Sequence, residues 1–180
     1  LSAFWMHRNF FGGAERLRLD GDVSGIGGQT GGIDYDLSAR LERPGTFFVD
    51  TDLFIELGYT RLDEPDFTSD VFEAGVGLKR IVNDHLTLEG GLGFYSSDVT
   101  DATGSGSFRL VTLPGRLTWS TRDDALDATE GHFIDADVMP FLGFADAGSG
   151  ARITLDGRMY RSLDADARFV LAARGQLGSI

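Results

Sequence analysis

Few side chains in this sequence are placed for catalysis or metal binding. The three histidines, His7, His85 and His132, stand in separate segments, and two of them adjoin predicted turns. The chain has no cysteine and no H-E-x-x-H pattern, so its residue types do not make a zinc site. It also has no G-x-S-x-G segment of the kind that presents a serine nucleophile. We therefore expect no catalytic residue, no cofactor and no metal, and hence no enzyme.

Two kinds of segment could hold a ligand but are better explained as loops. Residues 24–32 (SGIGGQTGG) lack both the G-x-G-x-x-G spacing and the lysine of a phosphate-binding loop. Residues 122–127 (RDDALD) and 163–167 (LDADA) carry aspartates that could bind a cation weakly. Aspartate also hydrogen-bonds its own backbone in turns, so we favour solvated turns.

The composition narrows the class of partner. The 180 residues, a length typical of one domain, contain 28 acidic and 16 basic side chains, giving a net charge of −12. This balance argues against nucleic acid as a partner, because a phosphate backbone requires a basic surface. No run of about 18 apolar residues is present, so no transmembrane helix is expected. A membrane β-barrel would escape that test, because its strands alternate between apolar and polar residues.

Alternation of apolar and polar residues is the dominant pattern. In residues 75–94 (GVGLKRIVNDHLTLEGGLGF) apolar side chains keep one parity on both sides of residues 83–85, which predicts two strands and a tight turn. The pattern recurs along the chain with no helix between the runs, which excludes βαβ architecture. We predict about nine antiparallel strands: residues 15–23, 33–41, 52–61, 71–80, 86–96, 108–119, 132–142, 152–160 and 167–177.

The two faces of these strands differ in chemistry. One face carries leucine, isoleucine and valine, while the other mixes both charges with glycine, and Lys79 is the only lysine. The charged face is predicted to hold Arg16, Arg18, Asp20, Asp22, Asp34, Asp36, Arg40, Glu56, Glu73, Lys79, Glu89, Arg109, Arg116, Asp135, Asp137, Arg152, Asp156, Arg158, Arg168 and Arg174. Most runs are longer than the roughly 5–6 residues of soluble strands and approach the roughly 9–11 that cross a bilayer. A transmembrane barrel with a hydrated lumen is favoured, and a soluble β-sandwich stays open.

Under the membrane interpretation only one register is possible. A slip of residues 152–160 by one position would turn Arg152, Asp156 and Arg158 toward lipid. A basic side chain facing lipid costs roughly 2–4 kcal/mol at the midplane, so the slip is strongly disfavoured.

Aromatic residues lie near both sets of predicted strand ends, as they do at membrane interfaces. Ordinary packing of aromatics in a core is the alternative. The first set is Trp5, Phe10, Phe11, Phe47, Phe48, Trp119, Tyr160 and Phe169, and the second set is Tyr59, Phe67, Phe72, Phe94, Tyr95, Phe141 and Phe144.

Two segments carry a family resemblance. Residues 5–25 (WMHRNFFGGAERLRLDGDVSG) and residues 117–143 (LTWSTRDDALDATEGHFIDADVMPFLG) are the segments concerned. The first resembles the H-R-N-hydrophobic-F-G-G-A-E entry into the barrel of BamA/TamA-type outer-membrane assembly proteins, the bacterial surface antigen family. The second resembles that family's periplasmic turn S-R-D-D-x-L-D-P-T-x-G, with Ala128 in place of the usual proline. The residues matching this turn are Arg122, Asp123, Asp124, Asp127 and Gly131.

The resemblance covers nearly the whole chain and is strongest toward the TamA branch. It implies an antiparallel up-and-down barrel of sixteen strands in the outer membrane of a Gram-negative bacterium. This chain would be the N-terminal part, with residues 1–14 leading in from a missing POTRA domain and with a V-R-G-Y motif and the closing strands absent. With two open edges left by the missing strands, we expect these residues alone not to close into a stable barrel.

The resemblance also implies a function and its partners. Such proteins fold client barrels or autotransporters through a lateral gate, where a client strand adds to an open edge by main-chain hydrogen bonds. The partners would be outer-membrane lipid, unfolded outer-membrane clients and a periplasm-spanning subunit that contacts the POTRA domains. The client-pairing edge would be the first strand, represented by Arg16, Leu17, Leu19, Gly21, Val23 and Gly25.

Alternatives to this assignment stay open. Gly21 would weaken the edge strand, but it equally fits a position that relieves crowding or marks a bend. A two-partner secretion transporter or a passive outer-membrane pore would share the barrel. A soluble β-sandwich binding module would share only the strand pattern.

Overall fold

The computed structural model describes residues 1–27, 31–164 and 166–180. Residues 28–30, which belong to the predicted loop 24–32, lie outside the described residues. The strands form one antiparallel sheet in the order β1-β2-β3-β4-β5-β6-β7-β9-β10-β11, and β8 also pairs with β6 and β9. Their bounds are β1 Ser2–Arg8, β2 Arg16–Ser24, β3 Asp34–Arg43, β4 Thr51–Glu64, β5 Phe67–Asn83, β6 Leu86–Asp101, β7 Gly104–Thr112, β8 Gly115–Ser120, β9 Gly131–Ala145, β10 Gly150–Ser162 and β11 Val170–Ser179.

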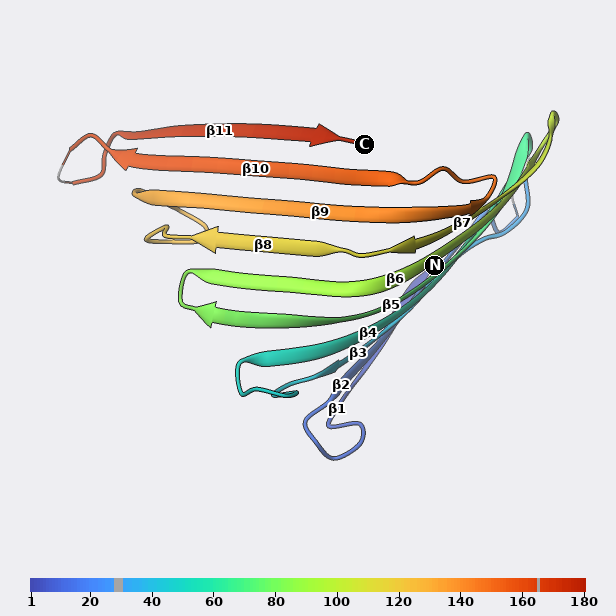
Figure 1. Ribbon diagram of the computed structural model, residues 1–180, viewed down its shortest axis with the longest axis horizontal. Helices are drawn as coiled ribbons and strands as arrows, with labels where there is room; N and C mark the ends of the chain where they lie inside the picture. The colour runs from blue at the N-terminus through green and yellow to red at the C-terminus, as the bar shows by residue number, and fades with distance from the viewer. Residues whose placement is uncertain (28–30, 165) are drawn as a thin grey trace.

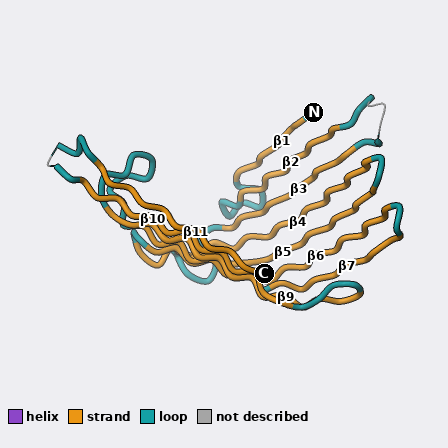
Figure 2. The backbone as a smooth tube through the Cα atoms, turned by 90° about the horizontal axis from the view of Figure 1, so that it is seen from above, coloured by secondary structure: helices purple, strands orange, loops and turns teal. Residues whose placement is uncertain are grey.

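The sheet is a single curved layer, with β1 and β11 at its two ends (Figures 1 and 2). The prediction of an antiparallel up-and-down barrel wall is therefore confirmed, and every predicted run lies on the sheet. In its described part the sheet has eleven strands where about nine were predicted, because one run is divided and β1 was not predicted. The run 108–119 is divided into β7 and β8 at Pro114, which has no N–H to donate to the ladder. The Leu113 N–H donates to the Pro140 carbonyl at 3.0 Å and the Gly91 N–H to the Pro114 carbonyl at 3.0 Å, so both halves stay in one row.

Strand β1 corrects the sequence prediction, which placed residues 1–14 in a lead-in segment. Ser2–Arg8 pairs with β2, with Ser2 opposite Asp22 and Arg8 opposite Arg16. Phe4 and Met6 share the face of Asp20 and Arg18, so this strand lacks the alternation that reveals the others. Because β2 pairs with β1 on one side and β3 on the other, residues 16–24 are not an edge of this sheet.

The pairing register gives the sheet one mainly apolar and one mainly polar face, because residues directly opposite each other share a face. Leu37 lies between Gly21 and Tyr59, and Val76 lies between Ile55 and Leu92. No hydrophobic side chain in the described part is buried. A β-sandwich would bury this face under a second sheet, which the single layer does not provide. The sandwich alternative therefore does not fit. The described part of the chain contains no helix that is long and apolar enough to cross a membrane.

The apolar band has the height of a membrane. On β5 the apolar face runs from Leu78 to Phe72 and is bounded by Arg80 and Asp70, which are ten residues apart. Ten residues of strand span about 33 Å at about 3.3 Å each. A tilt of about 40° reduces this span to about 25 Å, which matches the apolar band of outer-membrane barrels. We name the two ends of the sheet the Arg122 end and the Asp70 end after residues that lie there.

Aromatic residues on the apolar face mark both limits of this band. Trp5 and Trp119 lie on it near the Arg122 end, and Tyr59, Phe72, Phe94 and Phe144 lie on it near the Asp70 end. The two-belt prediction holds for these residues. Four aromatics of the predicted belts instead occupy the polar face: Phe67, Tyr95, Phe141 and Tyr160.

Substitutions at two adjacent residues in the middle of β9 can show which face of the sheet meets lipid. Val138 lies on the apolar face opposite Ile153, and Met139 lies on the polar face opposite Arg152. In the full-length protein in lipid vesicles, Val138→Lys should lower the free energy of unfolding by about 2–4 kcal/mol. Met139→Lys should change it far less, because its ammonium would lie in water. Urea titration followed by gel mobility of the folded barrel measures both, and equal losses would contradict the assignment.

Candidate functional site

The polar face carries a band of ion pairs that crosses the sheet from strand to strand. On β2 to β4, Glu42 accepts from Arg16 and Arg40, and Arg40 also pairs with Glu56. On β5 and β6, the Lys79 ammonium lies 3.4 Å from the Glu89 carboxylate. Neighbouring strands are thus linked through side chains of opposite charge.

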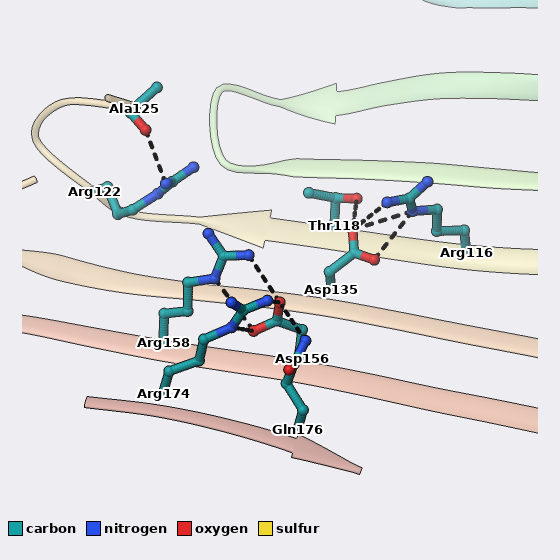
Figure 3. Close-up of polar contacts among 9 residues, drawn as sticks. All are labelled: Arg116, Thr118, Arg122, Ala125, Asp135, Asp156, Arg158, Arg174 and Gln176. Atoms are coloured by element: carbon teal, nitrogen blue, oxygen red, sulfur yellow. Dashed lines mark hydrogen bonds and ion pairs between the residues drawn. The ribbon is translucent and has the colours of Figure 1, made fainter. Parts of the chain in front are cut away.

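The band continues across β8 to β11, where carboxylates lie between arginines (Figure 3). Arg116 reaches Asp135 at 3.0 Å. Asp156 accepts hydrogen bonds from Arg158 at 2.8 Å and from Arg174 at 2.6 Å. Pairs as exposed as these contribute only about 0–1 kcal/mol each. These pairs balance positive and negative charge across the polar face. A face that carries so many charged side chains must be hydrated.

A hollow of about 850 Å³ lies on this polar face between β2 and β10. Its lining combines charged residues, strand positions that carry no side chain and apolar residues: Arg18, Arg40, Glu56, Glu73 and Arg152, then Gly58, Gly75 and Gly93, and then Leu57, Val76, Leu92 and Leu110. Beside it the Phe54 ring lies so close to Gly77 that a Cβ there would be 2.4 Å from Phe54 Cζ. The Arg40 guanidinium stacks over the same ring at 4.8 Å. The hollow is therefore lined by both charged and apolar residues.

The β8–β9 turn is closed by two aspartates. The Asp123 carboxylate accepts from the Thr129 N–H at 2.9 Å, the Glu130 N–H at 3.1 Å and the Thr129 hydroxyl at 2.5 Å. The Thr129 hydroxyl and the Glu130 N–H hold the pKa of Asp123 well below its ordinary value. The Asp124 carboxylate accepts from the N–H groups of Leu126 and Asp127 at 2.7 and 2.9 Å. Both carboxylates therefore serve the fold of the turn.

The same turn is tied to the polar face by Arg122. Its guanidinium stacks on Phe133 at 4.5 Å, and Arg158 lies over the same ring at 5.0 Å. Arg122 also donates to the Ala125 carbonyl at 3.0 Å (Figure 3). Gly131 closes the turn with φ +105°, and a Cβ there would lie 2.2 Å from the Thr121 carbonyl oxygen. Of the residues predicted for this turn, Asp127 and Gly131 contribute through the backbone, whereas Arg122, Asp123 and Asp124 contribute through their side chains.

The β1–β2 turn is built by the other motif. Asn9 has φ +65°, and its side chain accepts from the Ala14 N–H at 2.8 Å. Glu15 is 5% exposed and accepts from the Gly13 N–H at 2.8 Å. Its own N–H and that of Gly13 lower the pKa of Glu15 from its ordinary value. The asparagine, glycine and glutamate of this segment thus have structural roles in one turn.

The predicted client-pairing segment divides between the two faces. Arg16 lies on the polar face, whereas Leu17, Leu19, Gly21 and Val23 lie on the apolar face. Gly25 follows β2 with φ +74°, and a Cβ there would meet the Gly32 carbonyl oxygen at 2.4 Å. At Gly21 a Cβ would meet only Leu37, at 3.3 Å, so this glycine makes room for that neighbour.

Two predicted members of the polar face lie elsewhere. Arg109 lies on the apolar face directly opposite Phe144, within the aromatic belt at the Asp70 end, and pairs with Asp98 at 2.8 Å. In the two-residue alternation Arg109 has the same parity as Val111, which lies on the apolar face. The charge of Arg109 nevertheless led to its prediction on the lumen side. Arg168 lies in the β10–β11 turn, where it pairs with Asp166 at 2.8 Å.

The stacking of Arg122 and Arg158 on Phe133 was not predicted, because it depends on which residues lie opposite each other across strands.

A family model described as the Omp85 superfamily domain matches residues 9–180. No curated protein matches the chain.

Asp123 offers a test of how the motif turn is held. Asp123→Ala removes the acceptor for the Thr129 and Glu130 N–H groups, so deuterium uptake in residues 121–131 of the full-length protein should accelerate. Because the folded pKa is depressed, the stabilisation is complete above the ordinary aspartate value of about 3.9 and is lost only at lower pH. The effect should therefore be constant from about pH 5 to pH 8.

Asp127→Ala is the matched control, because within the described residues the Asp127 carboxylate accepts no hydrogen bond. Hydrogen exchange read by mass spectrometry follows both variants. Unchanged uptake in Asp123→Ala would show that the carboxylate does not hold the turn.

Proposed function

The chain belongs to the Omp85 superfamily, and on this premise we propose that it forms part of the barrel of a TamA-type outer-membrane assembly factor. Omp85 proteins are bacterial outer-membrane proteins that insert other outer-membrane proteins or secrete proteins, and they are not enzymes. The proposal specifies this activity as the folding of client barrels or autotransporters through a lateral gate. The remaining strands of a sixteen-stranded barrel and the POTRA domains belong to the same proposal.

The observation that carries the proposal is the match over residues 9–180 combined with the structure of the two motif turns. Both segments that resemble the TamA branch form closed, hydrogen-bonded turns at the Arg122 end of the sheet. The resemblance assigns this end to the periplasm, where POTRA domains would receive unfolded clients. A factor of this kind requires a stable wall next to lipid and a wet interior, and the two faces of the sheet supply these two environments.

A secretion transporter is the second candidate, and the polar hollow favours it. Its lining of charged and apolar residues would suit a polypeptide passing through the lumen. The two functions differ in where the client ends. An assembly factor leaves the client folded in the membrane, whereas a transporter delivers it to the far side.

Reconstitution tests the function directly. The full-length protein in lipid vesicles is supplied with a urea-unfolded outer-membrane barrel and, separately, with a secreted two-partner substrate. We expect protease-resistant, folded client in the bilayer and no secreted substrate inside the vesicles. Folding no faster than in empty vesicles would overturn the proposal. Steady ion conductance without client folding would indicate a passive pore.

Client pairing at β2 is part of the proposal and requires β1 to leave its place. The β1–β2 interface offers few attractive side-chain interactions on the polar face: Ser2 donates to Asp22 at 2.5 Å, and the Arg18 guanidinium lies over the Phe4 ring at 5.3 Å. Arg8 lies opposite Arg16, which is a repulsive pairing. By contrast, β3 holds Arg16 through Glu42. Release of β1 would expose the main-chain groups of β2 to a client strand.

A disulfide between β1 and β2 should therefore block client folding. Phe4 and Asp20 lie directly opposite each other, so Phe4→Cys with Asp20→Cys can lock the pair under oxidation. The control, Asp20→Cys with Ser38→Cys, locks β2 to β3 and should preserve activity. Client folding in vesicles is measured with and without reductant. Full activity of the oxidised β1–β2 variant would exclude β2 as the client-pairing edge.

A further inference from the structure

The β3–β4 turn presents three consecutive apolar residues to the exterior. Phe47, Phe48 and Val49 are 78%, 61% and 90% exposed. The turn is nevertheless fixed, because the Thr46 N–H donates to the Thr51 carbonyl at 2.7 Å and the Ile81 N–H donates to the Asp50 carbonyl at 3.0 Å. An ordered apolar run of this kind is unfavourable in water and indicates a surface that is covered.

The neighbouring β1–β2 turn repeats this feature. Phe11 is 71% exposed and packs edge-on against Phe10, whose ring in turn meets His7, with centroid distances of 4.7 and 5.6 Å. Phe11 also lines a groove with Leu41, Arg43, Leu53 and Ile55, which lie on the apolar face. The two turns are therefore continuous with the band of the barrel that faces lipid.

Arginines accompany these aromatics on the same face. Arg80 ends the apolar band of β5, and its guanidinium lies over the Phe48 ring at 5.2 Å. Arg43 ends the band of β3, and its partner Glu15 is 3.8 Å away. Within the described residues Arg80 has no carboxylate partner. One unpaired cation and one weakly paired cation in this part of the chain thus stand beside exposed phenylalanines.

The Asp70 end of the same face has a different charge pattern. Arg61 lies 3.3 Å from Asp70, and Arg109 lies 2.8 Å from Asp98. Asp63, near Arg61 at 3.8 Å, adds a further negative charge. Because these two cations are neutralised, an anionic ligand would be attracted more strongly to the Arg122 end.

We propose that Phe11, Phe48, Arg43 and Arg80 form an interfacial site for anionic glycerophospholipid headgroups, and we call these four residues the phospholipid collar. The phenylalanines would enter the boundary between headgroups and acyl chains, and the guanidinium groups would bind the phosphodiester. Juxtamembrane basic residues attract anionic lipid in this way. The proposal goes beyond client assembly and rests on the outer-membrane location of the family, since client folding does not itself require headgroup selectivity.

Lipid retention tests the charge part of the collar. The full-length protein is exchanged into micelles that contain equal amounts of phosphatidylglycerol and phosphatidylcholine, and native mass spectrometry counts the bound lipids. The wild type should retain phosphatidylglycerol preferentially, and Arg43→Gln with Arg80→Gln should lose that preference. Arg61→Gln with Arg109→Gln, which removes two cations from the opposite end of the same face, should keep it. No preference in the wild type, or the same loss in both double variants, would overturn the proposal.

Depth measurement tests whether lipid or a protein domain covers the turn. The chain has no cysteine, so Phe48→Cys can carry a bimane probe in the full-length protein, with any other cysteine replaced. In vesicles of brominated phosphatidylglycerol its fluorescence should be quenched, whereas a probe at Thr103→Cys in the β6–β7 turn should be quenched much less. An unquenched probe at residue 48 would mean that protein covers this turn and would overturn the proposal. Client folding measured on the same variants separates this result from failure of the assembly function.

Discussion

The separation of charge from hydrocarbon within a single layer is the constraint on which this structure depends. Successive side chains of a strand point to opposite sides, so one sheet can face lipid and water at once only if its sequence keeps a strict two-residue period. From Leu78 to Phe72 the period holds without exception on β5, and charged residues appear on the apolar side only at Arg80 and Asp70. A soluble protein would need a second layer to cover the same aliphatic residues, and this sheet has none in its described part.

The polar face follows from the same constraint. Charges excluded from the outside gather inside, where neighbouring strands can balance them, as Glu42 does between Arg16 and Arg40. Individual exposed pairs add little stability, so most of the energy that holds the wall in place comes from the backbone ladder and from the lipid outside. The ion-pair band instead keeps the lumen hydrated and keeps the local net charge of its wall close to zero. This environment suits the handling of unfolded polypeptide by an Omp85 protein.

Much of the fold could be predicted from sequence because alternation is a local property. All nine predicted runs became strands, since apolar side chains recur at every second position of each. Strand β1 was not predicted, because Phe4 and Met6 place apolar side chains on the polar face and break the alternation. Arg109 was assigned to the lumen because parity and charge conflict there: it lies outward at the aromatic limit of the membrane band, where an arginine paired with Asp98 costs less than at the midplane. The stack of Arg122 and Arg158 on Phe133 needs the register between strands, which alternation does not supply.

Accessibility scanning along β9 can show directly whether the apolar face meets hydrocarbon and the polar face meets water. Spin labels placed singly from residue 133 to residue 142 in the full-length protein are measured in bilayers against oxygen, which partitions into lipid, and a water-soluble nickel complex. We predict that oxygen accessibility peaks at Ile134, Ala136, Val138 and Leu142. Nickel accessibility should peak at Phe133, Asp135, Asp137 and Met139. A reversed pattern, or low accessibility to both reagents on the apolar side, would contradict it.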